Sequence, residues 1–271
     1  MVRVRIISFA HPKNWNDTAQ KTVKDDFVKI TSTSKSWVKR NGSRGVRYGI
    51  YKTPELVNPS NLISLPLVWE KIMASSSSKI EDLLDSVETG NENSISTFTG
   101  KLVIDFEEGL GYLIETGFIL MPIPKITELL EKLSEDTGVS LNNARFFSWD
   151  KNKIIQFRDV AVQNNFTPTR ETGSIGLVRI DARGDIEHEP KWINAESMLN
   201  DGSWTKSSYE NLDQNNRFGF ALVKKGNYVS FHKNVENDNL SLLMSRIFLV
   251  KGLFEQTLGK TIPEYCFSDH L

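Results

Sequence analysis

Residues 185–192, with the sequence DIEHEPKW, hold the densest group of side chains that could bind a metal ion. In a strand, side chains alternate between two faces, so the three carboxylates and Lys191 would share one face. Neighbouring carboxylates repel unless water or a cation screens them, and hard divalent cations take several oxygen ligands. Glu189 and Lys191 also have the spacing of the Glu-x-Lys half of many metal-dependent nuclease sites. In those sites the carboxylate binds Mg²⁺ and the lysine orients water or phosphate.

A nuclease of this kind would need a further acid. Asp105 lies within the apolar segment LVIDF, and Asp181 lies at the end of an expected strand. An acid in such a segment either faces outward from a half-exposed strand or is held for a purpose. Asp105, Asp181, Glu189 and Lys191 are therefore the catalytic set of one hypothesis, a magnesium-dependent nuclease or phosphoesterase. The commoner explanation of each residue is a solvated strand face, and Pro190 indicates a strand edge.

Charge is distributed unevenly along the chain. Residues 1–53 carry 12 Lys and Arg against 3 Asp and Glu, a net charge of +9, whereas all 271 residues together have a formal net charge of -1. Like charges within one fold repel, so such asymmetry usually has a use. The basic segment could bind a polyanion, contact the acidic remainder of the chain, or bind an acidic partner protein.

The most basic segment, residues 34–52, interleaves cationic and aromatic side chains with glycines. Cations neutralise phosphates, aromatic rings stack on unpaired bases, and glycines allow close approach of the backbone. A solvated β-hairpin explains the same pattern without a ligand, because Asn41-Gly42 is a strong turn signal. The candidate nucleic-acid-binding residues are Lys35, Trp37, Lys39, Arg40, Arg44, Arg47, Tyr48 and Tyr51.

Other catalytic motifs find little support. The single cysteine, Cys266, lies between two aromatic residues, as packed thiols do, and the four histidines are not spaced as a ligand set. The sequence lacks a phosphate-binding loop, a dinucleotide-binding glycine turn and a nucleophile elbow. These observations disfavour ATPases, dinucleotide oxidoreductases and serine hydrolases, and leave open whether the protein is an enzyme.

Composition indicates a cytoplasmic protein without a membrane partner. One cysteine cannot form an intramolecular disulfide, and no apolar stretch is long enough to span a bilayer. Arg3 and Arg5 interrupt the first residues, which favours a strand over a signal peptide. The abundance of Asn, Ser and Lys is typical of AT-rich genomes, including those of phages and mobile elements.

In the first third of the chain, hydrophobic periodicity predicts strands and helices in alternation. A Ser- and Asn-rich segment at 75–96 is the best candidate for a boundary. It would separate a basic α/β portion, residues 1–90, from a hairpin-rich portion, residues 91–271, although both could form one domain. The predicted elements are strands at 2–9 and 44–52, and helices at 17–30, 61–74 (beginning near Pro66) and 79–88.

After residue 96 the pattern favours hairpins, because β-prone runs flank short polar connections. A helix at 125–137 should end at Gly138, a long loop should cover 194–216, and Asn237 or Asp238 should cap an apolar final helix. The fold class expected is α+β, with a mostly antiparallel sheet packed by a few helices. The expected hairpins are 96–106 with 110–121, 145–149 with 153–162, 175–181 with 185–192, and 217–223 with 228–233.

The function expected from these patterns is nucleic-acid binding through residues 34–52, as one component of a larger assembly, for example of a phage or mobile element. The nuclease is the catalytic alternative, and a scaffold that binds a protein partner is the third. The sequence does not distinguish DNA from RNA.

Overall fold

The structure of the chain is a computed structural model. It describes residues 1–9, 29, 39–40, 47–51, 55–57, 62–72, 95–117, 119–148, 151–175, 178–183, 203–211, 217–224, 227–232 and 239–268. The elements predicted at 17–30, apart from Lys29, and at 79–88 and 185–192 lie outside these residues.

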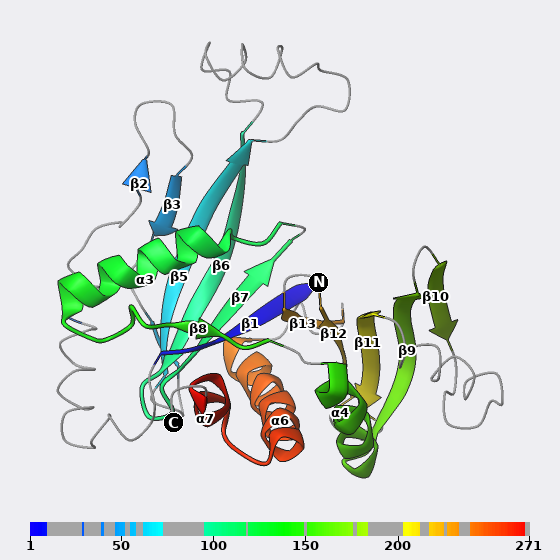
Figure 1. Ribbon diagram of the computed structural model, residues 1–271. Coiled ribbons are helices and arrows are strands. Elements are labelled where there is room, and N and C mark those ends of the chain that lie inside the picture. The colour runs from blue at the N-terminus through cyan, green and yellow to red at the C-terminus, as the bar shows by residue number, and fades with distance from the viewer. Residues whose placement is uncertain are drawn as a thin grey trace. The chain divides into compact units, whose positions relative to one another are not determined.

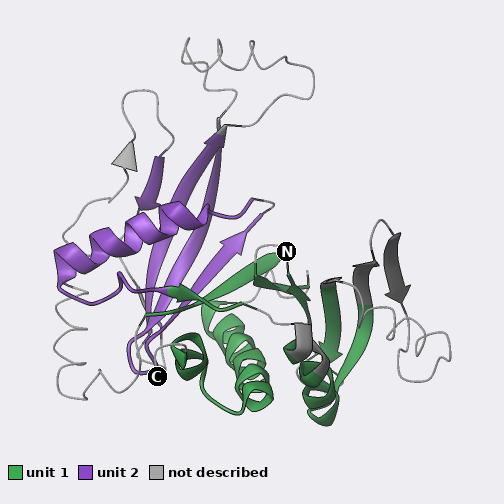
Figure 2. Ribbon diagram, viewed as in Figure 1, with its two compact units in different colours: residues 1–11, 145–271 green, residues 12–144 purple. Residues whose placement is uncertain are grey.

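The chain forms two compact units (Figure 2). One comprises residues 12–144, and the other combines residues 1–11 with residues 145–271. The boundary expected near residue 90 does not coincide with this division, because the strands on either side of it pair with each other.

The 12–144 unit contains an antiparallel sheet with the strand order β7-β6-β5-β3-β2 (Figure 1). β4 also pairs with β5. Its centre is the long pair β5 and β6, which are 11 residues each and keep one register from Ile63↔Ile104 to Ile72↔Ile95. The strands are β2 (Lys39–Arg40), β3 (Arg47–Ile50), β4 (Glu55–Val57), β5 (Leu62–Ile72), β6 (Ile95–Asp105) and β7 (Leu110–Thr116).

The helix predicted at 61–74 is wrong, since these residues form β5. In an antiparallel strand the N–H and C=O of one residue point to the same side, and Pro66 accepts a hydrogen bond from Tyr51 N–H on the side away from β6. Pro66 falls between the segments of β5 that pair with β3 and with β4. The sheet therefore tolerates a proline that lacks an N–H, because its nitrogen faces away from β6, at the place where the pairing with β3 ends.

The helix predicted at 125–137 is confirmed as α3 (Ile123–Thr137). Gly138 adopts the left-handed conformation at its C-terminal end, and its N–H donates to Ser134 O. The buried residues recur at helical spacing along one face. Before α3, the buried carboxylate of Glu115 accepts a hydrogen bond of 2.6 Å from Met121 N–H, which fixes the entry into the helix.

The second unit contains an antiparallel sheet with the order β10-β9-β11-β12-β13-β1, and β8 pairs with β1. The strand predicted at 2–9 is confirmed as β1, and the hairpin predicted from 217–223 and 228–233 is confirmed as β12 and β13. In the 12–144 unit, the hairpin predicted from 96–106 and 110–121 is confirmed as β6 and β7. The strands of the second unit are β1 (Val2–Ser8), β8 (Arg145–Phe146), β9 (Phe166–Ile175), β10 (Val178–Arg183), β11 (Ser203–Asn211), β12 (Gly219–Val223) and β13 (Tyr228–Phe231).

Three predictions for this unit are wrong. Residues 153–162 belong to a helix, α4 (Lys151–Gln163), in which Phe157 and Ala161 are buried one turn apart. The turn predicted at 182–184 is wrong at its first two residues, because β10 runs through Arg183 and pairs with β9. The loop predicted at 194–216 contains β11, whose Tyr209 is buried against Phe157 and Phe220.

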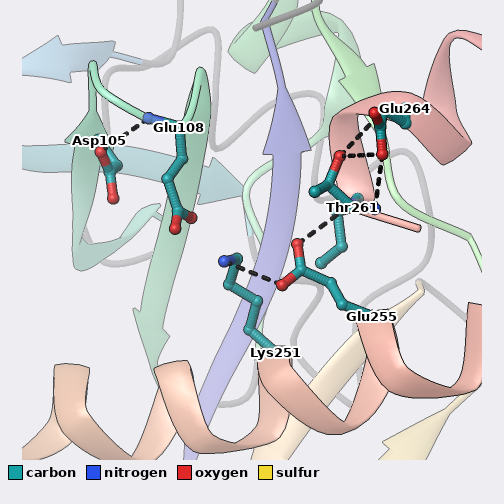
Figure 3. A network of polar contacts seen from close by, with 7 residues as sticks. Asp105, Glu108, Lys251, Glu255, Thr261 and Glu264 are labelled. Carbon is teal, nitrogen blue, oxygen red and sulfur yellow. Dashed lines mark hydrogen bonds and ion pairs between the residues drawn. The ribbon is translucent and has the colours of Figure 1, made fainter. Parts of the chain in front are cut away.

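The C-terminal helices close the core of the second unit. Asn239, one residue beyond the predicted caps, accepts a hydrogen bond from Leu242 N–H at the start of α6 (Leu240–Leu258). Glu255 links α6 to α7 (Ile262–Cys266): it pairs with Lys251 at 3.1 Å and accepts the Ile262 N–H at 3.1 Å (Figure 3). The fold class is therefore α+β with mostly antiparallel pairing, as expected. None of the described helices is long and apolar enough to cross a membrane.

Gly100 is a site of close packing in the 12–144 unit. A Cβ atom there would lie 2.6 Å from Ile114 O and 3.1 Å from Trp69 Cζ3. We expect Gly100→Ala to lower the free energy of unfolding by about 1–3 kcal/mol, because neither the backbone nor the packed indole can yield easily. Urea unfolding measures the change. Thr97→Val on the exposed part of the same strand is the control, expected within about 0.5 kcal/mol of the wild type; equal losses for the two variants would contradict the packing argument.

Candidate nucleic-acid interface

Of the residues proposed for a nuclease, the structure describes Asp105 and Asp181, which belong to different units. Asp105 ends β6 in one unit, and Asp181 lies in β10 of the other, opposite Thr172. Glu189 and Lys191 lie outside the described residues. Within the described parts of the chain, no group of three His, Cys, Asp or Glu residues is arranged to hold a metal ion.

Asp105 has a structural task in the turn between β6 and β7 (Figure 3). Its Oδ1 accepts hydrogen bonds from Glu107 N–H at 3.0 Å and from Glu108 N–H at 3.1 Å. Such bonds let an aspartate imitate one residue of a turn. Burial raises the pKa of Asp105 to about 6, and the neighbouring charges of Glu108 and Glu107 add to this, while the two backbone hydrogen bonds lower it. The side chain that closes this turn is therefore a carboxylate that ionises reluctantly.

The described parts of the basic segment, β2 and β3 with Tyr51, form the outer end of the sheet in the 12–144 unit. β2 pairs with β3 so that Lys39 is opposite Tyr48 and Arg40 is opposite Arg47. Two cationic residues thus occupy directly opposed positions, and like charges at such positions repel. Lys35, Trp37 and Arg44 lie outside the described residues. The register therefore concentrates positive charge on the hairpin of β2 and β3.

Arg47 is partly neutralised by an acid that the sequence did not single out. Its backbone N–H donates to Glu70 Oε2 at 2.8 Å, and its guanidinium Nε forms an ion pair with Glu70 Oε1. The side chain of Glu70 is 6% exposed, whereas that of Arg47 is 47% exposed. Glu70 was assigned to a helix from the sequence, so its position beside β3 could not be foreseen.

Tyr48 is unsuited to stacking on a base, because only 3% of its surface is exposed. Lys125 of α3 lies 4.4 Å from the centre of its ring. Burial raises the pKa of Tyr48, and the nearby negative charge of Glu128 adds to this. Tyr48 therefore anchors α3 to β3, on the face of the sheet that also holds Trp69 and Phe98.

The opposite face of the same sheet is exposed over part of its area. Alternation from Arg47 puts Tyr51 on this face, where its N–H bond to Pro66 O continues the pairing of β3 by one residue. Tyr51 is 37% exposed, and Thr97 and Thr99, two strands away on β6, are exposed on the same face. We call this surface the open face; its members are Arg47, Tyr51, Thr97, Thr99, Lys101 and Thr116.

The residues of the open face come from different strands, and only the register of those strands places them on one surface. Glu70, beside Arg47, is opposite Thr97, and Thr99 is adjacent to Thr116, whose Oγ1 donates to Thr99 O at 3.3 Å. Lys101 is half-buried farther along β6. The sequence could have indicated Thr97, Thr99 and Lys101 by their alternation within 96–106, but nothing local links them to Arg47. The result is a surface of cationic, hydroxyl and aromatic groups on regular strands.

Comparison of the sequence with protein-family models finds no match, and comparison with curated proteins finds no significant similarity. Function must therefore be argued from the residues themselves.

Asp105 makes stability depend on pH. A free aspartate has a pKa of about 3.9, and in the folded protein the pKa of Asp105 is raised to about 6. The folded state holds the proton more tightly, so the contribution of Asp105 to stability is full below pH 4 and is lost as the pH rises through 6. Asn in its place keeps an oxygen for both backbone donors and has no charge. Relative to the wild type, Asp105→Asn should therefore gain up to about 3 kcal/mol between pH 4 and pH 7.

Urea unfolding of both proteins across this pH range measures that difference. Asp159→Asn, which removes an exposed acid from α4, is the control and should show no such trend. A difference between Asp105→Asn and wild type that stays constant with pH would refute the assignment.

Proposed function

We propose that the protein binds nucleic acid through the open face and the adjoining hairpin of β2 and β3. The observation that carries the proposal is the register of the sheet, which puts Arg40 opposite Arg47 and joins both to an exposed row of threonines. Guanidinium groups neutralise phosphates, and hydroxyl groups donate hydrogen bonds to phosphate oxygens. A surface on strands is also rigid, which lowers the entropic penalty of binding.

Tyr51 favours unpaired nucleic acid as the ligand. Its exposed ring is on the same face as Arg47, and an aromatic ring can stack only on a base that is not enclosed in a duplex. Each stacked base is worth about 1–3 kcal/mol. We therefore expect single strands to bind more tightly than duplexes of the same length.

The other expectations from the sequence have weaker support. Membership in a larger assembly would give the acidic remainder of the chain a role, but no contact with a partner argues for it. The nuclease alternative has no observation in its favour, because Asp105 is used in its turn. Part of the basic charge is also used internally, since Arg5 is only 3% exposed and Arg3 lies 5.4 Å from the Tyr228 ring centre.

Charge reversal on the hairpin tests the proposal. We expect Arg40→Glu combined with Arg44→Glu to weaken binding to single-stranded oligonucleotides at least about tenfold, because cations that neutralise phosphates supply most of such affinity. The slope of log Kd against log salt should shrink by about 2, one for each arginine replaced. Fluorescence anisotropy over a salt series measures both quantities, for DNA and for RNA.

The control variant, Lys132→Glu combined with Lys224→Glu, makes the same change of net charge at exposed positions of α3 and of the β12–β13 turn. It should bind almost as tightly as the wild type. Equal losses for the two double variants, or wild-type binding that is absent or insensitive to salt, would rule the proposal out.

Glu70 provides a test in the opposite direction. Its carboxylate competes with phosphate for the Arg47 guanidinium, so Glu70→Gln should tighten binding by about two- to tenfold and steepen the salt dependence. The same anisotropy series measures the gain. Glu131→Gln on α3 removes an equal charge from an exposed position and is the control; an unchanged Kd for Glu70→Gln would argue that Arg47 does not contact the ligand.

A further inference from the structure

The outward side of α6 has an unusual composition for an exposed helix. Its exposed residues are Leu242, Ser245, Leu249, Gly252 and Gln256. Leu242 is 41% exposed and Leu249 40% exposed, which places both among the large apolar side chains that the described part of the chain leaves open to solvent. We call these five residues the α6 seam.

The α6 seam has the spacing of a helix–helix interface. Its residues are separated by three, four, three and four positions. This alternation is the a/d pattern in which one helix packs along another by inserting side chains between those of its neighbour. The opposite side of α6 is already used, since Met244, Ile247 and Phe254 are buried in the core. The spacing therefore indicates a second helical contact, which the described residues of one copy do not make along this side.

Gly252 is an independent observation on the same seam. Glycine is among the weakest helix formers, and this one lies inside α6 with no positive φ. A Cβ atom added to Gly252 would meet no atom within 4 Å. Nothing in the part of one copy that the structure describes therefore requires glycine there. A second helix backbone that approaches closely would explain it, because small residues let helices come together.

The seam also has no charged residue, although 25% of the chain is Asp, Glu, Lys or Arg. It is symmetric about Leu249: a two-fold axis through that residue would oppose Leu249 to its own copy and Ser245 to Gly252. Leu242 would meet the aliphatic part of Gln256, whose Oε1 is held by Asn164 at 3.1 Å. A surface that is uncharged and complementary to itself meets its own copy without repulsion, as an isologous interface must.

We propose that the α6 seam joins two copies of this chain as an antiparallel helix pair. One helix of 19 residues offers a small interface, so the dimer should dissociate in the micromolar range. This inference is independent of nucleic-acid binding, because it uses none of the residues of the open face.

Sedimentation velocity over a concentration range on the order of 5–500 μM tests it. The wild type should shift from monomer to dimer, and Leu249→Lys should remain monomeric throughout. Ile123→Lys introduces the same cation at an exposed apolar residue of α3 and should dimerise as the wild type does. A wild type that stays monomeric at the highest concentration, or a Leu249→Lys variant that still dimerises, would overturn the proposal.

Orientation is tested by crosslinking in a Cys266→Ser background. Ser245→Cys combined with Gly252→Cys should form a disulfide-linked dimer under mild oxidation, because an antiparallel pair brings residue 245 to residue 252 of the second copy. Ser245→Cys alone should remain uncrosslinked. Crosslinking of the single variant to a similar extent would indicate a parallel pair and overturn the arrangement.

Discussion

The pairing of β5 with β6 is the constraint on which the 12–144 unit depends. It joins residues on either side of a long polar segment and keeps one register over ten residue pairs. Because strand faces alternate, a slip of one residue would exchange the buried face with the exposed one. Trp69 and Phe98 would then leave the side covered by α3, and Thr97 and Thr99 would enter it. In the observed register Gly100 lies against Ile114 and Trp69, where a larger residue would not fit.

This constraint explains how a basic segment becomes an organised surface. β3 pairs with β5, and β2 pairs with β3, so each strand takes its register from the one before it. Tyr48 attaches this edge to α3, and Glu70 fixes the position of Arg47. The tyrosine that the sequence offered as a ligand contact is thus one of the supports, while threonines from a distant strand take a place on the surface. The second unit is organised differently, around an aromatic core in which Phe157, Tyr209 and Phe220 meet edge to face or stacked.

The sequence was sufficient where local chemistry decides structure. The hairpin of β12 and β13, and α3 with Gly138 at its end, follow from alternation, polar turns and a left-handed glycine. It failed where tertiary pairing decides. A run of apolar residues such as 62–69 is compatible with a buried strand or a buried helix. Pro66 favoured the helix, because local sequence does not reveal that it would lie between the segments of β5 that pair with β3 and with β4. The opposite error was made for residues 153–162, which were predicted as a strand and form a helix. Their isoleucines and valines favour strands, but packing places Phe157 and Ala161 on one helix face.

The candidate nucleic-acid interface was also predictable only where local sequence is sufficient. Clustered cations are visible in the sequence, and residues 34–52 were found in that way. Glu70, Thr97 and Thr99 were not, because their proximity to Arg47 is created by register and not by spacing along the chain.

The shortness of β2 has a consequence for the behaviour of the protein at high concentration. It is two residues long, both residues are cationic, and it ends the order of the described strands in its unit. A longer neutral edge would offer unpaired backbone groups to any extended chain and so nucleate aggregation. Two basic residues offer too few hydrogen bonds and too much like charge for that, so the same side chains that could attract a polyanion also protect the sheet from growing by addition of further strands.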